Sequence, residues 1–133
     1  GIKDATGDLT RGIDLIKRLP VNFSVLSGDD ATALSLMLLG GKGVISVTAN
    51  VAPKLMHEMY ASVVAKRNEK AIEINQQLFA LHTNLFIEAN PIPVKWALKS
   101  MGLIKEGIRL PLVELNSEYH KIIQTAMKEA HIQ

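Results

Sequence analysis

The sequence contains no cysteine among its 133 residues. Disulfides, thiolate metal sites and a cysteine nucleophile are therefore excluded within this chain. Aromatic residues make up only 5% of the sequence, so the core must be aliphatic. A nucleic-acid-binding protein concentrates basic residues on one face beside stacking aromatics. Here Lys and Arg are spread evenly and the net charge is only +2, which disfavours nucleic acid as a partner.

Long hydrophobic runs are also lacking. No apolar run reaches the roughly 18 residues that a membrane-spanning helix needs, so we expect no membrane partner. No signal or transit peptide is visible. The hydrophobic share of 47% and the charged share of 21% are those of a folded globular protein. The length suits one domain of ordinary size.

Three short runs rich in β-branched residues are each followed by turn residues, at 1–7, 23–30 and 43–50. Near-continuous apolar runs of this length, bounded by Gly, Ser and Asp, are typical of strands buried on both faces of a parallel sheet. Residues 9–19 and 31–39 carry helical spacing between these runs. The sequence therefore predicts two βα units followed by a third strand.

The second half of the chain has a purely helical pattern. Pro53 suits the first turn of a helix, which would complete the third βα unit. Further helices are predicted at 72–86, 90–102 and 113–130. We therefore predict that residues 1–66 form three βα units and that residues 67–133 form a C-terminal helical domain.

Two α/β architectures contain such units with right-handed crossovers, an open doubly wound sheet and a closed (β/α)₈ barrel. Three strands complete neither, and a full barrel takes about 250 residues. The dinucleotide-binding version of the open sheet is disfavoured because no G-x-G-x-x-G motif is present. We expect the C-terminal portion of a larger α/β structure, which belongs to a longer protein or needs a partner chain.

Lys3 stands at the end of the first predicted strand, directly before a Gly/Thr/Asp turn. In a (β/α)₈ barrel, residues at the carboxyl ends of strands point into the active site. A lysine that is partly desolvated there attacks a carbonyl as the neutral amine and forms a Schiff base. The position equally suits a lysine that reaches into solvent or pairs with the neighbouring Asp4. Position alone leaves these interpretations open.

The stretch "SGDD" at 27–30 also follows a predicted strand. Gly28 would allow a ligand to approach the backbone closely, which predicts a substrate-contacting loop. Asp29 and Asp30 equally suit the start of a helix, where carboxylates accept hydrogen bonds from unpaired N–H groups. Both interpretations stay open. The four histidines have no metal-ligand spacing, so we expect no metal.

Four stretches resemble the dihydrodipicolinate synthase family, in the same order and at matching intervals: "GIKDATGDL", "VLSGDD", "GVISVTANV" and "NPIPVKWAL". The motif around Lys3 is shared with N-acetylneuraminate lyase and other pyruvate-dependent class I aldolases, whereas the last two stretches are more specific. The resemblance covers nearly the whole chain. It implies the last three βα units of a (β/α)₈ TIM barrel and a C-terminal helical extension.

The resemblance also implies a reaction. Lys3 would be the catalytic residue that forms a Schiff base with pyruvate. The resulting enamine would attack aspartate semialdehyde in lysine (diaminopimelate) biosynthesis, without a cofactor. Ile45 matches the position whose backbone carbonyl faces the pyruvate site. Gly28 and Asp29 match the loop near the second substrate, and Asn90 lies in the segment that borders the mouth of the site.

The resemblance further implies a homotetramer, in which Leu9 and Leu39 contact another dimer, and a location in the cytoplasm, or in the plastid of a plant. The family's proton relay of tyrosine and threonine and its carboxylate-binding groups belong to the first half of the barrel. Tyr60 and Tyr119 cannot replace them. We therefore expect the N-terminal half as a partner. Two alternatives stay open, another pyruvate-dependent aldolase and a non-catalytic fragment that is inert without that half.

Overall fold

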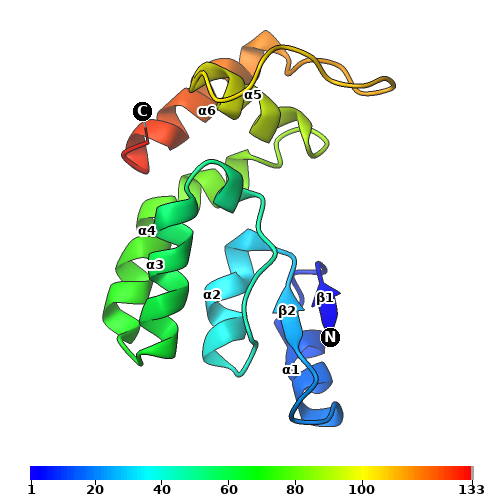
Figure 1. The fold of residues 1–133 in the computed structure, drawn as a ribbon, viewed down its shortest axis with the longest axis vertical. Coiled ribbons are helices and arrows are strands. Elements are labelled where there is room, and N and C mark those ends of the chain that lie inside the picture. Colours follow the sequence, from blue (N-terminus) through cyan, green and yellow to red (C-terminus); the bar gives the residue numbers. More distant parts are fainter. Residues whose placement is uncertain (133) are drawn as a thin grey trace.

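The computed structural model describes residues 1–132. Within them, two short strands alternate with helices, and the rest of the chain is helical (Figure 1). The elements are β1 (Ile2–Asp4), α1 (Leu9–Arg18), β2 (Val25–Ser27), α2 (Asp30–Leu38), the 3₁₀ helix η1 (Thr48–Asn50), α3 (Pro53–Val64), α4 (Asn68–Asn84), α5 (Ile92–Ser100) and α6 (Ser117–Glu129). No helix of this described part is long and apolar enough to cross a membrane.

The sheet consists of β1 and β2, which pair in parallel with Lys3 opposite Leu26. Both strands run toward the end of the molecule where α5 and α6 lie (Figure 1). Helices α1 and α2 pack closely, because a Cβ atom on Gly12 would lie 2.5 Å from Cδ1 of Leu36. The βα order at 1–39 is therefore confirmed, and the loops that follow the two strands meet at one edge.

The predicted third strand at 43–50 is wrong as a regular strand. Its residues run beside β2 but form only one bridge, between Val44 and Ser27. The Val25 carbonyl of β2 accepts a hydrogen bond from Lys42 N–H at 2.8 Å. In a regular parallel ladder that pairs Val44 with Ser27, Gly43 N–H would donate this hydrogen bond instead. Gly43 has a φ of +150°, which departs from strand geometry and breaks the register.

The end of this segment turns into η1 instead of continuing as a strand. The backbone N–H groups of Val47 and Thr48 both donate to Oδ2 of Asp30, at 2.9 Å each. These N–H groups are unavailable to a neighbouring strand, so the chain coils at this point. The third βα unit thus keeps its helix, α3, and a parallel but irregular strand segment.

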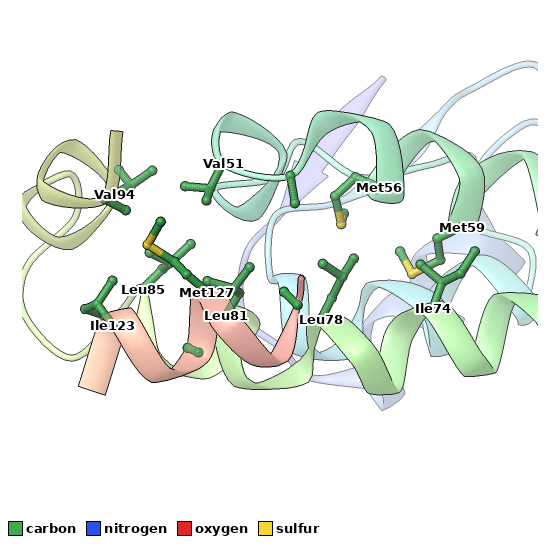
Figure 2. Packing of buried hydrophobic residues seen from close by; sticks show 14 of the residues in the cluster. Val51, Met56, Met59, Ile74, Leu78, Leu81, Leu85, Val94, Ile123 and Met127 are labelled. Carbon is green, nitrogen blue, oxygen red and sulfur yellow. The ribbon is translucent and has the colours of Figure 1, made fainter. Parts of the chain in front are cut away.

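The hydrophobic core lies among the helices. Figure 2 shows α3 and α4 packed along their length, with α6 closing one end. Met59, Leu78 and Ile123 are completely buried at its centre. A fully buried aliphatic side chain stabilises a fold by about 1.5–3 kcal/mol. The helices therefore contribute most of the apolar burial, and β1 contributes no residue to this cluster.

The starts of α4 and α6 each differ by four residues from those predicted. Helix α4 begins at Asn68, four residues before the predicted start, directly after a turn in which Lys66 has a φ of +58°. Helix α6 begins at Ser117 and not at 113, because the side chain of Asn116 accepts a hydrogen bond from Glu118 N–H at 3.1 Å. The division into two domains near Lys66 stays a prediction.

Candidate active site

Lys3 lies on the uncovered face of the sheet. Side chains alternate along a strand, and residues paired in register share a face. Lys3 and Leu26 therefore point to one side, and Asp4 and Ser27 to the other. Asp4 and Ser27 are buried, whereas Lys3 is exposed. This face of the sheet is uncovered among the described residues, so the Lys3 side chain is accessible. Burial of both faces within the whole barrel stays a prediction.

Asp4 does not pair with Lys3. Its Oδ2 atom lies 3.2 Å from Nε of Arg11, and its Oδ1 atom accepts a hydrogen bond from Thr6 N–H at 3.1 Å. Burial raises the pKa of the Asp4 carboxyl, but the hydrogen bonds from Thr6 and the Arg11 guanidinium lower this pKa by more, so it lies below its ordinary value. The interpretation of Lys3 as an ion-pair partner of Asp4 is therefore wrong.

Gly28 provides the space in which the Lys3 side chain lies. A Cβ atom at position 28 would come within 2.6 Å of the Lys3 Cε atom and 2.7 Å of the Ala5 Cβ atom. The Gly28 N–H donates to the Asp4 carbonyl at 2.7 Å, which fixes the two strand ends together. We predicted that a ligand would approach Gly28 closely, and the structure shows the Lys3 side chain in that space.

Asp29 caps helix α2. Its Oδ2 atom accepts hydrogen bonds from Thr32 N–H at 3.0 Å and from the Thr32 hydroxyl at 2.7 Å. The capping interpretation is confirmed. The Oδ1 atom is not used by the cap, so a contact of Asp29 with a substrate stays a prediction.

Ile45 is 51% exposed. Its N–H donates to the Ser27 carbonyl at 2.9 Å. Because Val44 is bridged to Ser27 and shares its face, the next residue, Ile45, lies on the same face as Lys3 and Leu26. The structure thus brings Lys3, Gly28 and Ile45 to one edge of the sheet.

Asn90 is an exposed residue of the loop between α4 and α5. This loop is tied to the start of α6, because Oε1 of Glu88 accepts a hydrogen bond from Asn116 N–H at 3.0 Å. Sequence reasoning did not find this role of Glu88, since the two residues are far apart in the chain and follow no periodicity. A role for Asn90 itself stays a prediction.

A buried polar cluster was missed by the sequence interpretation. Asp30 and Thr48 are 1% and 0% exposed, and the Thr48 hydroxyl lies 2.9 Å from Nδ1 of His82. Burial lowers the pKa of His82, although the carboxylates of Asp30 and Asp29 act in the opposite direction. His82 is therefore held neutral and joins α4 to η1. In the sequence, only the position of His82 on the buried face of α4 could have indicated this role.

Leu9 and Leu39 lie at opposite ends of parallel helices. Leu9 opens α1 and is half-buried, whereas Leu39 follows the last residue of α2 and is 49% exposed. The structure does not bring them together, and both stay candidate interface residues.

Residues 1–130 match the model of the dihydrodipicolinate synthetase family. The chain belongs to this family. A 4-hydroxy-tetrahydrodipicolinate synthase of Nitrosomonas europaea is 62% identical over 132 residues, which are 99% of this chain and 45% of the relative. A relative from Cellvibrio japonicus with the same name is 55% identical over 130 residues, 98% of this chain and 45% of its own length.

The crystal structure of the dihydrodipicolinate synthase from Acinetobacter baumannii, complexed with pyruvate, matches with a TM-score of 0.96 and 54% identity. The match covers all of this chain and 46% of that one. The enzyme from Aquifex aeolicus matches with a TM-score of 0.92 and 40% identity over 98% of this chain and 44% of its own. The chain thus spans about half the length of its relatives, and its fold is the C-terminal part of the family's (β/α)₈ barrel.

Proposed function

We propose that this chain supplies the nucleophilic lysine of a lyase that condenses pyruvate with aspartate semialdehyde in lysine (diaminopimelate) biosynthesis. One observation carries the proposal. Lys3 lies accessible at the carboxyl end of a parallel strand, in a chain that belongs to the dihydrodipicolinate synthetase family. The carboxyl ends of barrel strands are where barrel enzymes place their catalytic groups. The pyruvate bound by the Acinetobacter relative supports the first substrate.

The proposed reaction begins when the neutral Lys3 amine attacks the keto carbon of pyruvate. Loss of water gives a protonated imine, and loss of a proton from the methyl carbon gives an enamine. The enamine carbon forms a bond to the aldehyde carbon of aspartate semialdehyde. The amino group of that substrate then attacks the imine carbon and displaces Lys3, which releases a hydroxy-tetrahydrodipicolinate and returns the free amine. The whole sequence consumes no cofactor.

Four further residues have proposed substrate roles. The Ile45 carbonyl faces pyruvate, and Gly28 keeps the Lys3 side chain at the strand end. Asp29 directs its uncapped oxygen to the second substrate, and Asn90 borders the mouth of the site. The exposure of Ile45 and the free Oδ1 of Asp29 support these roles.

The N-terminal half of the barrel is the proposed partner. The described sheet has an unpaired edge at β1 and another beyond the bridge at Val44, and such edges favour pairing with further strands. A hollow of about 410 Å³ lies beside that second edge and contains Leu26, Val44 and Tyr60 in its wall. Tyr119 belongs to α6, which lies away from β1 (Figure 1). The proton relay is therefore proposed to come from the other half, and general acid–base help is typically worth about 10²–10⁴-fold.

We further propose a homotetramer in which Leu9 and Leu39 contact a second dimer, and a cytoplasmic location. The exposure of Leu39, an apolar side chain at the end of α2, supports the contact. The boundary between barrel and helical domain is proposed at residue 66, where the chain turns between α3 and α4.

Borohydride trapping tests the reaction in a preparation that contains this chain together with the first half of the barrel. Incubation with pyruvate and reduction should add one pyruvate-derived group to the peptide that carries Lys3. The variant Lys3→Ala should lose the adduct and the condensation, whereas Lys42→Ala, which removes another exposed lysine, should keep both. An adduct that survives in Lys3→Ala would contradict the assignment.

A further inference from the structure

The carbonyl of Ile45 lies where the hydrogen-bond ladder to β2 stops. Two regular rungs join the segments, from Ser27 N–H to the Gly43 carbonyl and from Ile45 N–H to the Ser27 carbonyl, each at 2.9 Å. The next rung of a parallel ladder would run from Asp29 N–H to the Ile45 carbonyl. That rung is not formed, and among residues 1–132 no backbone N–H group bonds the Ile45 carbonyl.

The Ser27 hydroxyl accepts the hydrogen bond from Asp29 N–H, the donor that would otherwise bond the Ile45 carbonyl. Asp29 N–H donates to Ser27 Oγ at 3.1 Å, and the same hydroxyl donates to the Asp29 carbonyl at 2.8 Å. Ser27 is 1% exposed, so this closed pair of hydrogen bonds is shielded from water. The serine thus satisfies Asp29 and leaves the Ile45 carbonyl without a partner from β2.

Asp30 holds the backbone that follows the Ile45 carbonyl in the chain. Its Oδ2 atom accepts the N–H groups of Val47 and Thr48, two and three residues after Ile45. The hydroxyl of Thr48 is held in turn by His82. The peptide between Ile45 and Val47 is therefore anchored at both ends, which opposes movement of the free carbonyl toward β2.

We propose that Ser27 and Asp30 are positioning residues that keep the Ile45 carbonyl free to accept a hydrogen bond from the group formed on Lys3. This inference rests on the proposed function. The acceptor would serve the hydroxyl of the first adduct or the N–H of the protonated imine, both of which need an acceptor when desolvated. The segment with Ile45 lies two strand spacings, about 10 Å, from β1, a distance that an extended lysine side chain and a hydrogen bond from the group on its amine together span.

The test compares Ser27→Ala with Ser62→Ala, a control that removes the hydroxyl of another serine, 2% exposed, in α3. Both are measured beside the first half of the barrel. The readouts are the pyruvate concentration that gives half-maximal borohydride trapping on Lys3, and the melting temperature. A hydrogen bond to a charged group is worth about 10–100-fold in affinity. We expect Ser27→Ala to raise that concentration by about tenfold or more, and Ser62→Ala to leave it unchanged.

Two variants at Asp30 separate positioning from folding. Asp30→Asn retains an oxygen that accepts both N–H groups and should keep trapping within about threefold of the unmodified protein. Asp30→Ala should weaken trapping as Ser27→Ala does; if it fails to fold, Ser27→Ala decides. A crystal structure of Ser27→Ala should show Asp29 N–H bonded to the Ile45 carbonyl.

The outcomes are distinct. Unchanged half-saturation in Ser27→Ala, with normal trapping in the unmodified protein, would overturn this inference and leave the proposed function in place. No trapping on Lys3 in the unmodified protein would overturn the proposed function and the inference with it. Equal effects of Ser27→Ala and Ser62→Ala on trapping and melting would show a merely structural role.

Discussion

The Cε atom of Lys3 lies 2.6 Å from the position that a Cβ atom on Gly28 would occupy. Any side chain at position 28 therefore competes with the proposed nucleophile for the same space. The lysine end is flexible, but the Ala5 Cβ atom, 2.7 Å from the same position, is not. The two strand ends would have to separate to admit even a methyl group.

Gly28→Ala should therefore slow formation of the pyruvate adduct by at least about tenfold, since small displacements of reacting groups have large effects on rate. The rate of borohydride trapping on Lys3 measures this. Gly12→Ala is a suitable control, because it places a methyl group against the flexible end of the Leu36 side chain, between α1 and α2. Equal trapping rates in Gly28→Ala and the unmodified protein would show that the lysine has another route to the substrate.

Asp29 combines a cap with a proposed substrate contact, and two substitutions separate them. Asp29→Ala should lower the free energy of unfolding by about 1 kcal/mol, because Thr32 N–H loses its acceptor. Asp29→Asn retains the cap and should keep that stability, but the loss of charge should raise the KM for aspartate semialdehyde several-fold. Chemical denaturation and steady-state kinetics measure the two effects. A KM that does not change in Asp29→Asn would leave capping as the residue's whole role.

His82 should make the fold less stable in acid. Burial lowers its pKa in the folded state, so the unfolded chain binds the proton more readily. The stabilising contribution is complete above the ordinary histidine pKa of 6.5 and is lost as the pH falls below it. The melting temperature should therefore fall between about pH 7 and pH 5, the range in which histidine titrates.

His82→Gln should show a weaker dependence in this range, because glutamine does not titrate there. His57→Gln serves as the control, since His57 is an exposed histidine on α3. If the melting temperatures of the unmodified protein and His82→Gln decline in parallel with pH, another group controls the acid response.

Leu39 tests the proposed tetramer. Leu39→Asp places a charge on an apolar side chain that is 49% exposed after α2. Burial of an unpaired charge in an interface is costly, so we expect the assembled enzyme to sediment as dimers. Val21→Asp is a control on another exposed apolar residue, 93% accessible, and should leave the tetramer intact. A tetramer in both variants would exclude Leu39 from the contact.

The βα order could be predicted from the sequence because its signals are local. Helix α1 begins at the predicted Leu9 and ends within one residue of the predicted end. Asp29 caps α2 as expected, since the capping hydrogen bond spans only three residues. The candidate site at Lys3, Gly28 and Ile45 came from strand ends and from resemblance, and the structure brings these residues to one edge.

Contacts over longer distances could not be predicted in this way. The coil at Val47 and Thr48 depends on the carboxylate of Asp30, 17 and 18 residues earlier in the chain. The anchor between Glu88 and Asn116 spans 28 residues. A backbone N–H group gives no sign in the sequence of which acceptor it will use, so an apolar run that looks like a strand can end as a coil.

The composition of the core sets an order of events during synthesis. Met37 and Met56 from the first half of the chain share one cluster with Ile123 and Met127 near its end. A ribosome makes the strands, α1 and α2 first, yet one end of this cluster stays open until α6 has left the exit tunnel. Until then the side chains of α4 that pack against α6 stay exposed. A nascent chain stopped before Ser117 should therefore be more sensitive to protease at α4 than the finished chain.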